Sequence, residues 1–185
     1  MRGPLVVVQF YKGDWLRAQN IWRRWMLAHN VPRPGGKLPQ PELFGCSSHL
    51  YGEMVQANEE NQKMCIDRYV AERIPIGHWW MDAGWYPCDP VGWPKTGTWE
   101  VDQKRFPGGL RPIADHAHAK GVKIIVWFEP ERVVAGTEFH RQHPDWVLTD
   151  GRSGQTTLLA NFGLREVQDH FFGIMKGFMT LPGFQ

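Results

Sequence analysis

The pattern of hydrophobic and polar positions divides the chain into short apolar runs and amphipathic stretches. Continuous apolar runs predict strands at four places: residues 5–11, 43–47, 76–82 and 122–128. Apolar residues at helical spacing predict five helices: from the N-cap Asp14 to about Asn30, over 58–73, from Pro112 to about Lys120, from Thr137 to before Pro144, and over 164–179. After residue 42, strands and helices alternate. This order is typical of an α/β fold with a parallel sheet.

Residues 33–41 interrupt this pattern, since the segment RPGGKLPQP is rich in Pro and Gly and holds neither a helix nor a strand ladder. We therefore expect a domain boundary, with one part over residues 1–40 and another over 41–185. The helix that begins at Asp14 lies in the first part. Its residues Trp15, Trp22 and Trp25 fall on one side, and we expect them to be packed.

The predicted strand 76–82 ends in Asp82, which is followed by Ala83, Gly84, Trp85 and Tyr86. In parallel α/β folds, ligands bind in the loops beyond the carboxyl ends of the strands. An Asp next to a Gly is also common in turns, so a simple turn is the alternative for Asp82. The aromatic surroundings favour a sugar-binding role, because an aromatic ring offers an apolar face together with a polar edge.

The predicted strand 122–128 ends in Trp127 and Phe128, and Glu129, Glu131 and Arg132 follow it. Glycosidases use a pair of carboxyl groups that flank the scissile bond. Glu129 and Glu131 are only two residues apart at one strand end, whereas an acid and a nucleophile usually come from different strands. We therefore expect these glutamates to be structural, paired with Arg132, with a hydrogen bond to a sugar hydroxyl as the alternative.

The composition of the 185 residues excludes several classes of function. Ten Trp exceed what packing normally requires, and a net charge of +2 gives no general attraction to nucleic acid or membranes. Cys46, Cys65 and Cys88 have neither disulfide-framework nor zinc-site spacing, which predicts a reducing, cytoplasmic location. His116 and His118 are two apart on a helix and are not expected to share a metal. No glycine-rich phosphate-binding loop follows a strand.

Four ordered motifs carry a resemblance to a known family. They are WMDAGWY at 80–86, GTWEVDQKRFPGGLRP at 97–112, WFEPE at 127–131 and HPDWVL at 143–148. Together they resemble the α-galactosidases of glycoside hydrolase family 36, the melibiases, and a looser likeness extends from the Asp14 helix to residues 158–163. The resemblance implies part of a (β/α)8 TIM barrel, about strands 1–3 with their helices, truncated before strand 4. Residues 1–40 would be the end of an N-terminal β-sandwich domain and a linker helix.

The resemblance also implies an activity for the parent enzyme. It would be a retaining exo-glycosidase that removes terminal α-linked galactose from oligosaccharides or glycoconjugates through a glycosyl-aspartate, without metal or organic cofactor. Asp82 would bind sugar hydroxyls and Trp127 would form a wall of the −1 pocket, while Trp85 and Tyr86 would line the same pocket or pack beneath the loop. The family's nucleophile and acid/base lie at the ends of strands four and six and have no counterpart here. We therefore expect the chain to be inactive alone. Assembly of the full-length protein into a homo-oligomer is an open alternative.

Two departures from the family pattern concern the sugar. Ala83 stands where the family commonly has a second Asp, and Ser47, Ser48 and His49 stand where it often has Asn, Ser and Trp. A galactose with nitrogen at carbon two is therefore the competitor of galactose, and His49 would face it or only satisfy a backbone carbonyl. For Trp99, Phe106, Trp146 and the turn at Asp102 we expect structural roles. The alternative function is a non-catalytic carbohydrate-binding or assembly protein.

Overall fold

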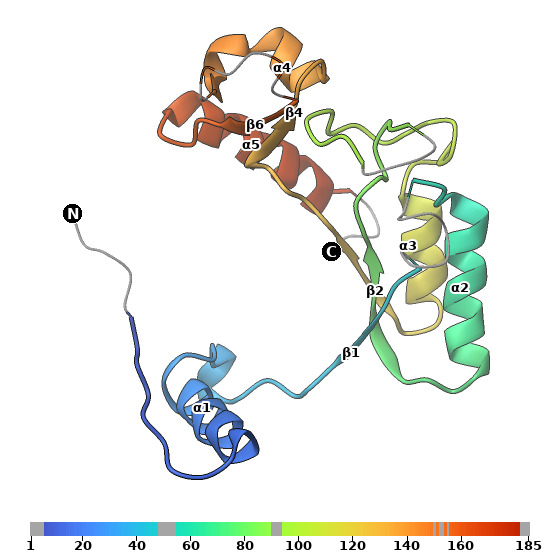
Figure 1. Cartoon of the computed structure of the whole chain (residues 1–185). Helices are drawn as coiled ribbons and strands as arrows, with labels where there is room; N and C mark the ends of the chain where they lie inside the picture. Colours follow the sequence, from blue (N-terminus) through green and yellow to red (C-terminus); the bar gives the residue numbers. More distant parts are fainter. Residues whose placement is uncertain are drawn as a thin grey trace. The chain divides into compact units, whose positions relative to one another are not determined.

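The computed structural model describes residues 6–47, 55–89, 94–149, 151, 154 and 156–181 (Figure 1). The chain forms two compact units, Met1–Pro41 and Glu42–Gln185. This division falls at the end of the segment rich in Pro and Gly. The assignment of the first unit to the end of a β-sandwich domain stays a prediction.

The first unit contains helix α1, Trp15–His29, and the short 3₁₀ turn η1, Pro34–Gly36. Asp14 caps α1 as predicted, since its side chain accepts a hydrogen bond from the backbone N–H of Arg17 at 2.9 Å. The strand predicted over 5–11 is wrong, because described residues 6–11 form no strand. A strand needs a partner for its backbone N–H and C=O groups, and the described part of this unit supplies none.

The prediction of packed tryptophans on α1 is also wrong within this unit. Helix α1 buries none of its residues, and Trp15 and Trp22 are 67% and 41% exposed. Trp22 stacks on Trp25, with ring centroids 5.1 Å apart. Periodicity identifies one apolar side of a helix, but burial needs a second layer, which the described remainder of the unit does not provide.

The second unit contains the predicted parallel sheet. Its strands lie in the order β1, Leu43–Gly45, then β2, Ile76–Met81, then β3, Lys123–Val126, and both neighbouring pairs are parallel. Helices α2, Glu59–Ala71, and α3, Arg111–His118, lie side by side on one face of the sheet (Figure 1). This arrangement is consistent with part of a TIM barrel, although each strand is shorter than predicted.

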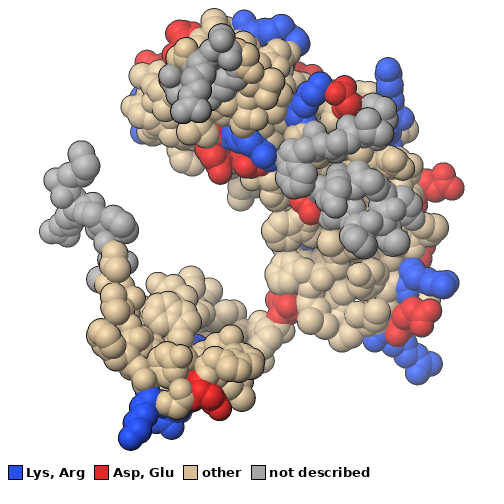
Figure 2. All heavy atoms as spheres, in the orientation of Figure 1, with Lys and Arg blue, Asp and Glu red and all other residues tan. Residues whose placement is uncertain are grey.

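Side chains of β2 alternate between the two faces of the sheet. Trp79 faces the helices, since its indole N–H donates to Gln62 of α2 at 3.0 Å, and Gln62 in turn donates to Ser47 at 2.6 Å. Trp80 therefore lies on the face opposite to that of Trp79 and Met81. Figure 2 shows an almost uncharged surface over β1 and β2, whereas charged side chains gather over the outer side of α2.

A second, antiparallel sheet follows and was not predicted. Its strands are β4, Arg132–Val134, β5, Val147–Leu148, and β6, Thr157–Ala160, in the order β4, β6, β5. Helix α4, Glu138–Gln142, and the turn η2, Pro144–Trp146, connect β4 to β5, and α5, Arg165–Met179, follows β6. Strands of two to four residues carry too little periodicity to be recognised in a sequence.

An aromatic cluster joins the loops after β2 and β3 to helix α5. Trp85 contacts Phe128 and Phe178 with ring centroids 5.2 and 4.8 Å apart, and Trp99 contacts Phe128 at 5.4 Å and Phe171 at 6.4 Å. Trp99, Trp85 and Phe171 are buried. The loops that leave the parallel sheet are therefore anchored in a hydrophobic core.

Candidate functional site

Asp82 and Trp127 lie next to each other at the carboxyl edge of the parallel sheet. Met81 pairs with Val126 in the ladder, and the backbone N–H of Trp127 donates to the carbonyl of Met81 at 2.9 Å. The next residue on each strand, Asp82 and Trp127, is thus placed on adjacent strand ends. The two residues that the sequence singled out are brought together.

The Asp82 carboxylate is oriented by its own loop. One oxygen accepts the backbone N–H of Ala83 at 2.8 Å, and Gly84 follows with φ of 86°. A positive φ suits glycine, because it lacks the Cβ that would clash. The turn and the site are compatible explanations of Asp82, because a carboxylate has two oxygens and can accept several hydrogen bonds. Asp82 is partly exposed, whereas Ala83 is buried.

Trp127 contacts two other tryptophans, Trp85 and Trp99. Its carbonyl accepts the indole N–H of Trp85 at 2.9 Å, and its ring centroid lies 6.5 Å from that of Trp99. Trp85 and Tyr86 are fully buried and pack edge to face at 5.2 Å. This burial agrees with the alternative that they pack beneath the loop, and a sugar contact of either residue stays a prediction.

Arg105 donates hydrogen bonds to the loop that follows Asp82, and this arginine was not identified from the sequence. We call Arg105, Asp102 and the carbonyls that Arg105 contacts the clasp. The Arg105 guanidinium donates to the carbonyls of Ala57 at 3.0 Å, Gly84 at 2.5 Å and Tyr86 at 2.8 Å. It also pairs with the Asp102 carboxylate at 2.8 Å. The only signal in the sequence is an acid and a base three residues apart. The guanidinium thus joins the segment at Ala57 to the loop at 84–86 and to the Asp102 side chain.

Asp102 completes this clasp, in agreement with the structural role expected for its turn. Its second oxygen accepts the backbone N–H of Lys104 at 2.9 Å, and its own N–H donates to the carbonyl of Trp85 at 3.0 Å. Although burial raises the pKa of Asp102, the hydrogen bonds from Arg105 and Lys104 outweigh it and lower that pKa below its ordinary value. The carboxylate is therefore ionised at neutral pH.

Burial raises the pKa of Tyr86 and of Cys88, and the nearby Arg105 guanidinium only partly opposes this for the Cys88 thiol. Both groups are neutral at physiological pH. A neutral thiol is a poor nucleophile. Neither side chain offers activated chemistry beside Asp82.

The other predicted residues have simple roles. Glu129 forms an ion pair with Arg132, which confirms the predicted structural pairing of that glutamate. His116 contacts Asp67 at 2.8 Å. His49 lies outside the described residues. Within the described ranges, no group of three or more His, Cys, Asp or Glu is arranged to hold a metal ion, and no helix is long and apolar enough to cross a membrane.

Comparison with known proteins places this geometry in a family. A family model described as Melibiase matches residues 54–182. Alpha-galactosidase Mel36A of Lactobacillus acidophilus is 30% identical over 119 residues, which cover 62% of this chain and 16% of that protein. An alpha-galactosidase of Escherichia coli is 26% identical over 140 residues, 74% of this chain and 18% of that protein.

Solved structures agree with these sequence relatives. The alpha-galactosidase from Lactobacillus brevis matches with a TM-score of 0.67 and 25% identity, covering 76% of this chain and 19% of that one. The chain thus spans less than a fifth of the length of these three relatives. The ordered motifs, the parallel sheet and these matches together assign the chain to the melibiase family, the α-galactosidases of glycoside hydrolase family 36.

Proposed function

We propose that this chain forms part of the sugar-binding end of an enzyme that hydrolyses terminal α-linked galactose, or an amino-substituted galactose, in oligosaccharides or glycoconjugates. The observation that carries the proposal is the placement of Asp82 beside Trp127 at the carboxyl edge of the parallel sheet. This edge is where parallel α/β folds bind ligands. The family membership of the chain supports the same function.

The two side chains have complementary tasks in this proposal. The Asp82 carboxylate accepts hydrogen bonds from sugar hydroxyls, and the Trp127 ring covers the apolar C–H face of the same sugar. The Ala83 N–H orients the carboxylate, and the aromatic residues behind Trp127 hold its ring. Rigid support of this kind lowers the entropic cost of binding, because the two side chains are already ordered before the ligand arrives.

The chemical step is assigned to residues outside this chain. A retaining glycosidase needs a nucleophile and an acid/base on opposite sides of the bond, and binding residues cannot replace them. The motifs at 80–86 and 127–131 contribute binding groups only. We therefore propose that the 185-residue chain is inactive alone. We also propose that residues 1–40 are the end of a β-sandwich domain and that the enzyme acts in the cytoplasm.

The proposal is tested by expressing the complete reading frame that contains this chain. The protein is assayed with p-nitrophenyl α-D-galactopyranoside and with the corresponding α-N-acetylgalactosaminide. A hydrogen bond to a charged group contributes about 1.5–3 kcal/mol, so Asp82→Asn should lower kcat/KM about 10- to 150-fold. Trp127→Ala should lower it in a similar range. The matched control is Asp115→Asn, which changes an exposed carboxylate on α3 that pairs with Arg111.

Each outcome decides a part of the proposal. Hydrolysis by the 185-residue chain alone would contradict the assignment of the chemical step to other residues. An Asp82→Asn enzyme as active as Asp115→Asn would remove Asp82 from the site. A complete protein that binds galactose but cleaves neither substrate would instead be a carbohydrate-binding protein.

A further inference from the structure

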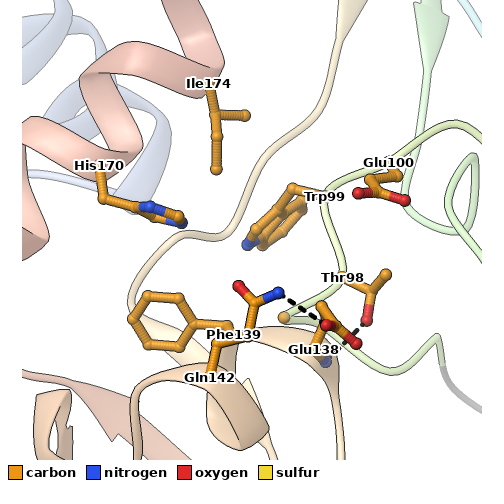
Figure 3. A pocket seen from close by; sticks show the side chains of 9 residues that line it. Thr98, Trp99, Glu100, Glu138, Phe139, Gln142, His170 and Ile174 are labelled. Carbon is orange, nitrogen blue, oxygen red and sulfur yellow. Dashed lines mark hydrogen bonds between the residues drawn. The ribbon is translucent and has the colours of Figure 1, made fainter.

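A cavity lies in the unit Glu42–Gln185, and its lining is distinct from the candidate site at the strand ends. Its volume is about 180 Å³, and neither Asp82 nor Trp127 lines it. It is formed by the segment 97–100, helix α4 and helix α5 (Figure 3). The side chains that matter for its chemistry are Trp99, Gln142, His170, Phe139 and Ile174.

Trp99 points an unsatisfied donor into this cavity. The residue is only 7% exposed, and its indole N–H has no hydrogen-bond partner among the described residues. In Figure 3 the indole nitrogen is directed into the space between His170 and Gln142. Buried donors are nearly always paired, so an unpaired one indicates a position where an acceptor binds.

Gln142 and His170 add polar groups around that donor. The Gln142 amide nitrogen donates to Glu138 at 2.7 Å, and the amide oxygen lies on the side of the Trp99 nitrogen (Figure 3). Burial lowers the pKa of His170, with a smaller contribution from nearby His143. The imidazole is therefore neutral at neutral pH and offers one donor and one acceptor.

The charges around the cavity disfavour an anionic ligand, because the lining includes the carboxylates of Glu100 and Glu138. Glu138 forms an ion pair with Arg141 on the same helix, so its charge is already compensated. Among the residues that the structure describes, no Lys or Arg lines the cavity. The walls between the polar groups are the aromatic rings of Trp99 and Phe139 and the aliphatic side chain of Ile174. The lining thus combines apolar faces with the neutral hydrogen-bonding groups of Gln142 and His170 and with the Glu100 carboxylate, which can also accept a hydrogen bond from a hydroxyl.

The volume sets the size of the ligand. An engineered protein cavity of about 150 Å³ accommodates a benzene ring. The present cavity is slightly larger, at about 180 Å³, and is suited to one six-membered ring with substituents that reach its polar edge. We propose that this cavity is a second binding site for a neutral monosaccharide. Its ring faces contact Trp99 and Phe139, and its hydroxyls pair with the Trp99 N–H, the Gln142 oxygen and His170.

The inference does not rest on the proposed hydrolytic function, and its test uses a separate signal. The 185-residue chain is labelled with ¹⁵N, and the indole N–H resonance of Trp99 is followed by NMR during titration with D-galactose and then D-glucose. Trp99→Phe identifies the resonance by its loss. A small ligand of this kind is expected to bind with a Kd of about 1 mM, so the titration extends to about 100 mM.

Three variants locate the binding. Gln142→Leu alters an exposed side chain and leaves the core intact, and it should weaken binding at least fivefold. Asp82→Asn changes the strand-end site and should leave the Trp99 titration unchanged. Trp22→Phe changes an exposed indole on α1 in the other unit and should also leave it unchanged.

A saturable shift of the Trp99 resonance that Gln142→Leu weakens and Asp82→Asn preserves supports the second site. Absence of any shift with both sugars overturns it, as does an unchanged Kd in Gln142→Leu. Loss of the shift in Asp82→Asn would assign the sugar to the strand-end site and overturn the inference, while supporting the proposed function.

Discussion

Removal of the Arg105 guanidinium should destabilise the second unit more than removal of any exposed arginine. Arg105→Met keeps most of the aliphatic stem but deletes the group that joins Asp102 to the carbonyls of Ala57, Gly84 and Tyr86. The side chains of Arg105 and Asp102 are 18% and 14% exposed, so water cannot fully replace the lost contacts. The Asp102 carboxylate would be left largely buried without its cation.

The magnitude follows from this burial. Breaking a buried ion pair by removing one partner costs about 3–5 kcal/mol, because the remaining charge is uncompensated. Hydrogen bonds to charged groups contribute about 1.5–3 kcal/mol each, but the carbonyls recover part of this by bonding water. We therefore expect the free energy of unfolding to fall by about 3–5 kcal/mol. With a urea m-value of about 2 kcal/mol/M, the midpoint falls by about 1.5–2.5 M.

The assay is urea unfolding of the 185-residue chain, followed by tryptophan fluorescence and far-UV circular dichroism. Arg165→Met is the matched control, because it removes an arginine from an ion pair with Asp169 on α5. Those side chains are 75% and 57% exposed. An exposed i,i+4 pair contributes about 0.3–0.5 kcal/mol, so this control should barely move the midpoint.

A midpoint for Arg105→Met within about 0.5 M of Arg165→Met, at an unchanged m-value, would refute the reasoning. Such a result would mean that the clasp is hydrated in solution and contributes no more than a surface pair. Arg105→Lys separates charge from geometry. One ammonium cannot serve the four acceptors with the planar spacing of a guanidinium, so it should recover only part of the loss.

Three further predictions concern glycine substitution and pH. Gly97→Ala should lower the free energy of unfolding by about 2 kcal/mol or more, because φ is 122° and an added Cβ would lie 2.3 Å from the Thr137 hydroxyl oxygen. In Gly173→Ala, on α5, the added Cβ meets nothing within 4 Å, so this variant should be more stable by about 0.5–1 kcal/mol, and thermal unfolding compares the two. The pKa of Asp102 is lowered on folding, so its stabilisation is complete above about pH 4 and is lost as the pH falls through the folded pKa; between about pH 5 and 3, Asp102→Asn should show a smaller fall in urea midpoint than the unmodified chain. The pKa of His170 is also lowered from 6.5, so stability should fall as the pH drops below that value while the unfolded chain takes up the proton first, and His170→Gln should flatten the urea midpoint between about pH 7.5 and 5.5.

The parallel sheet was predictable because its signals are local and consistent. The strand β2 is a continuous apolar run, and helix α2 begins at a capping box in which Asn58 and Asn61 each accept the other's backbone N–H at 2.9 Å. Helix α3 begins at Arg111 with Pro112 in its first turn, as proline preference indicates. Parallel strands bring their carboxyl ends to one edge, and the resemblance to a barrel family made β2 and β3 neighbours, so the two together predicted the proximity of Asp82 and Trp127.

Apart from the short strands of the antiparallel sheet, the features that escaped prediction depend on distant contacts. Arg105 finds its acceptors 19, 21 and 48 residues away along the chain, and nothing local indicates those partners. The cavity beside Trp99 exists only because α5 packs across from segment 97–100. The exposure of Trp15 and Trp22 depends on what covers α1, which a helical pattern does not specify.

Trp99 connects the two proposed sites, and this gives the aromatic cluster a role beyond burial. One side of Trp99 belongs to the cavity lining, and its ring also lies 6.5 Å from Trp127 and 6.1 Å from Trp85. Trp85 in turn donates its indole N–H to the carbonyl of Trp127. Trp99 therefore packs between the cavity lining and the residue proposed to cover the sugar. Because close-packed interiors transmit strain, we expect a change in the packing of α5 against segment 97–100 to alter the position of Trp127 as well.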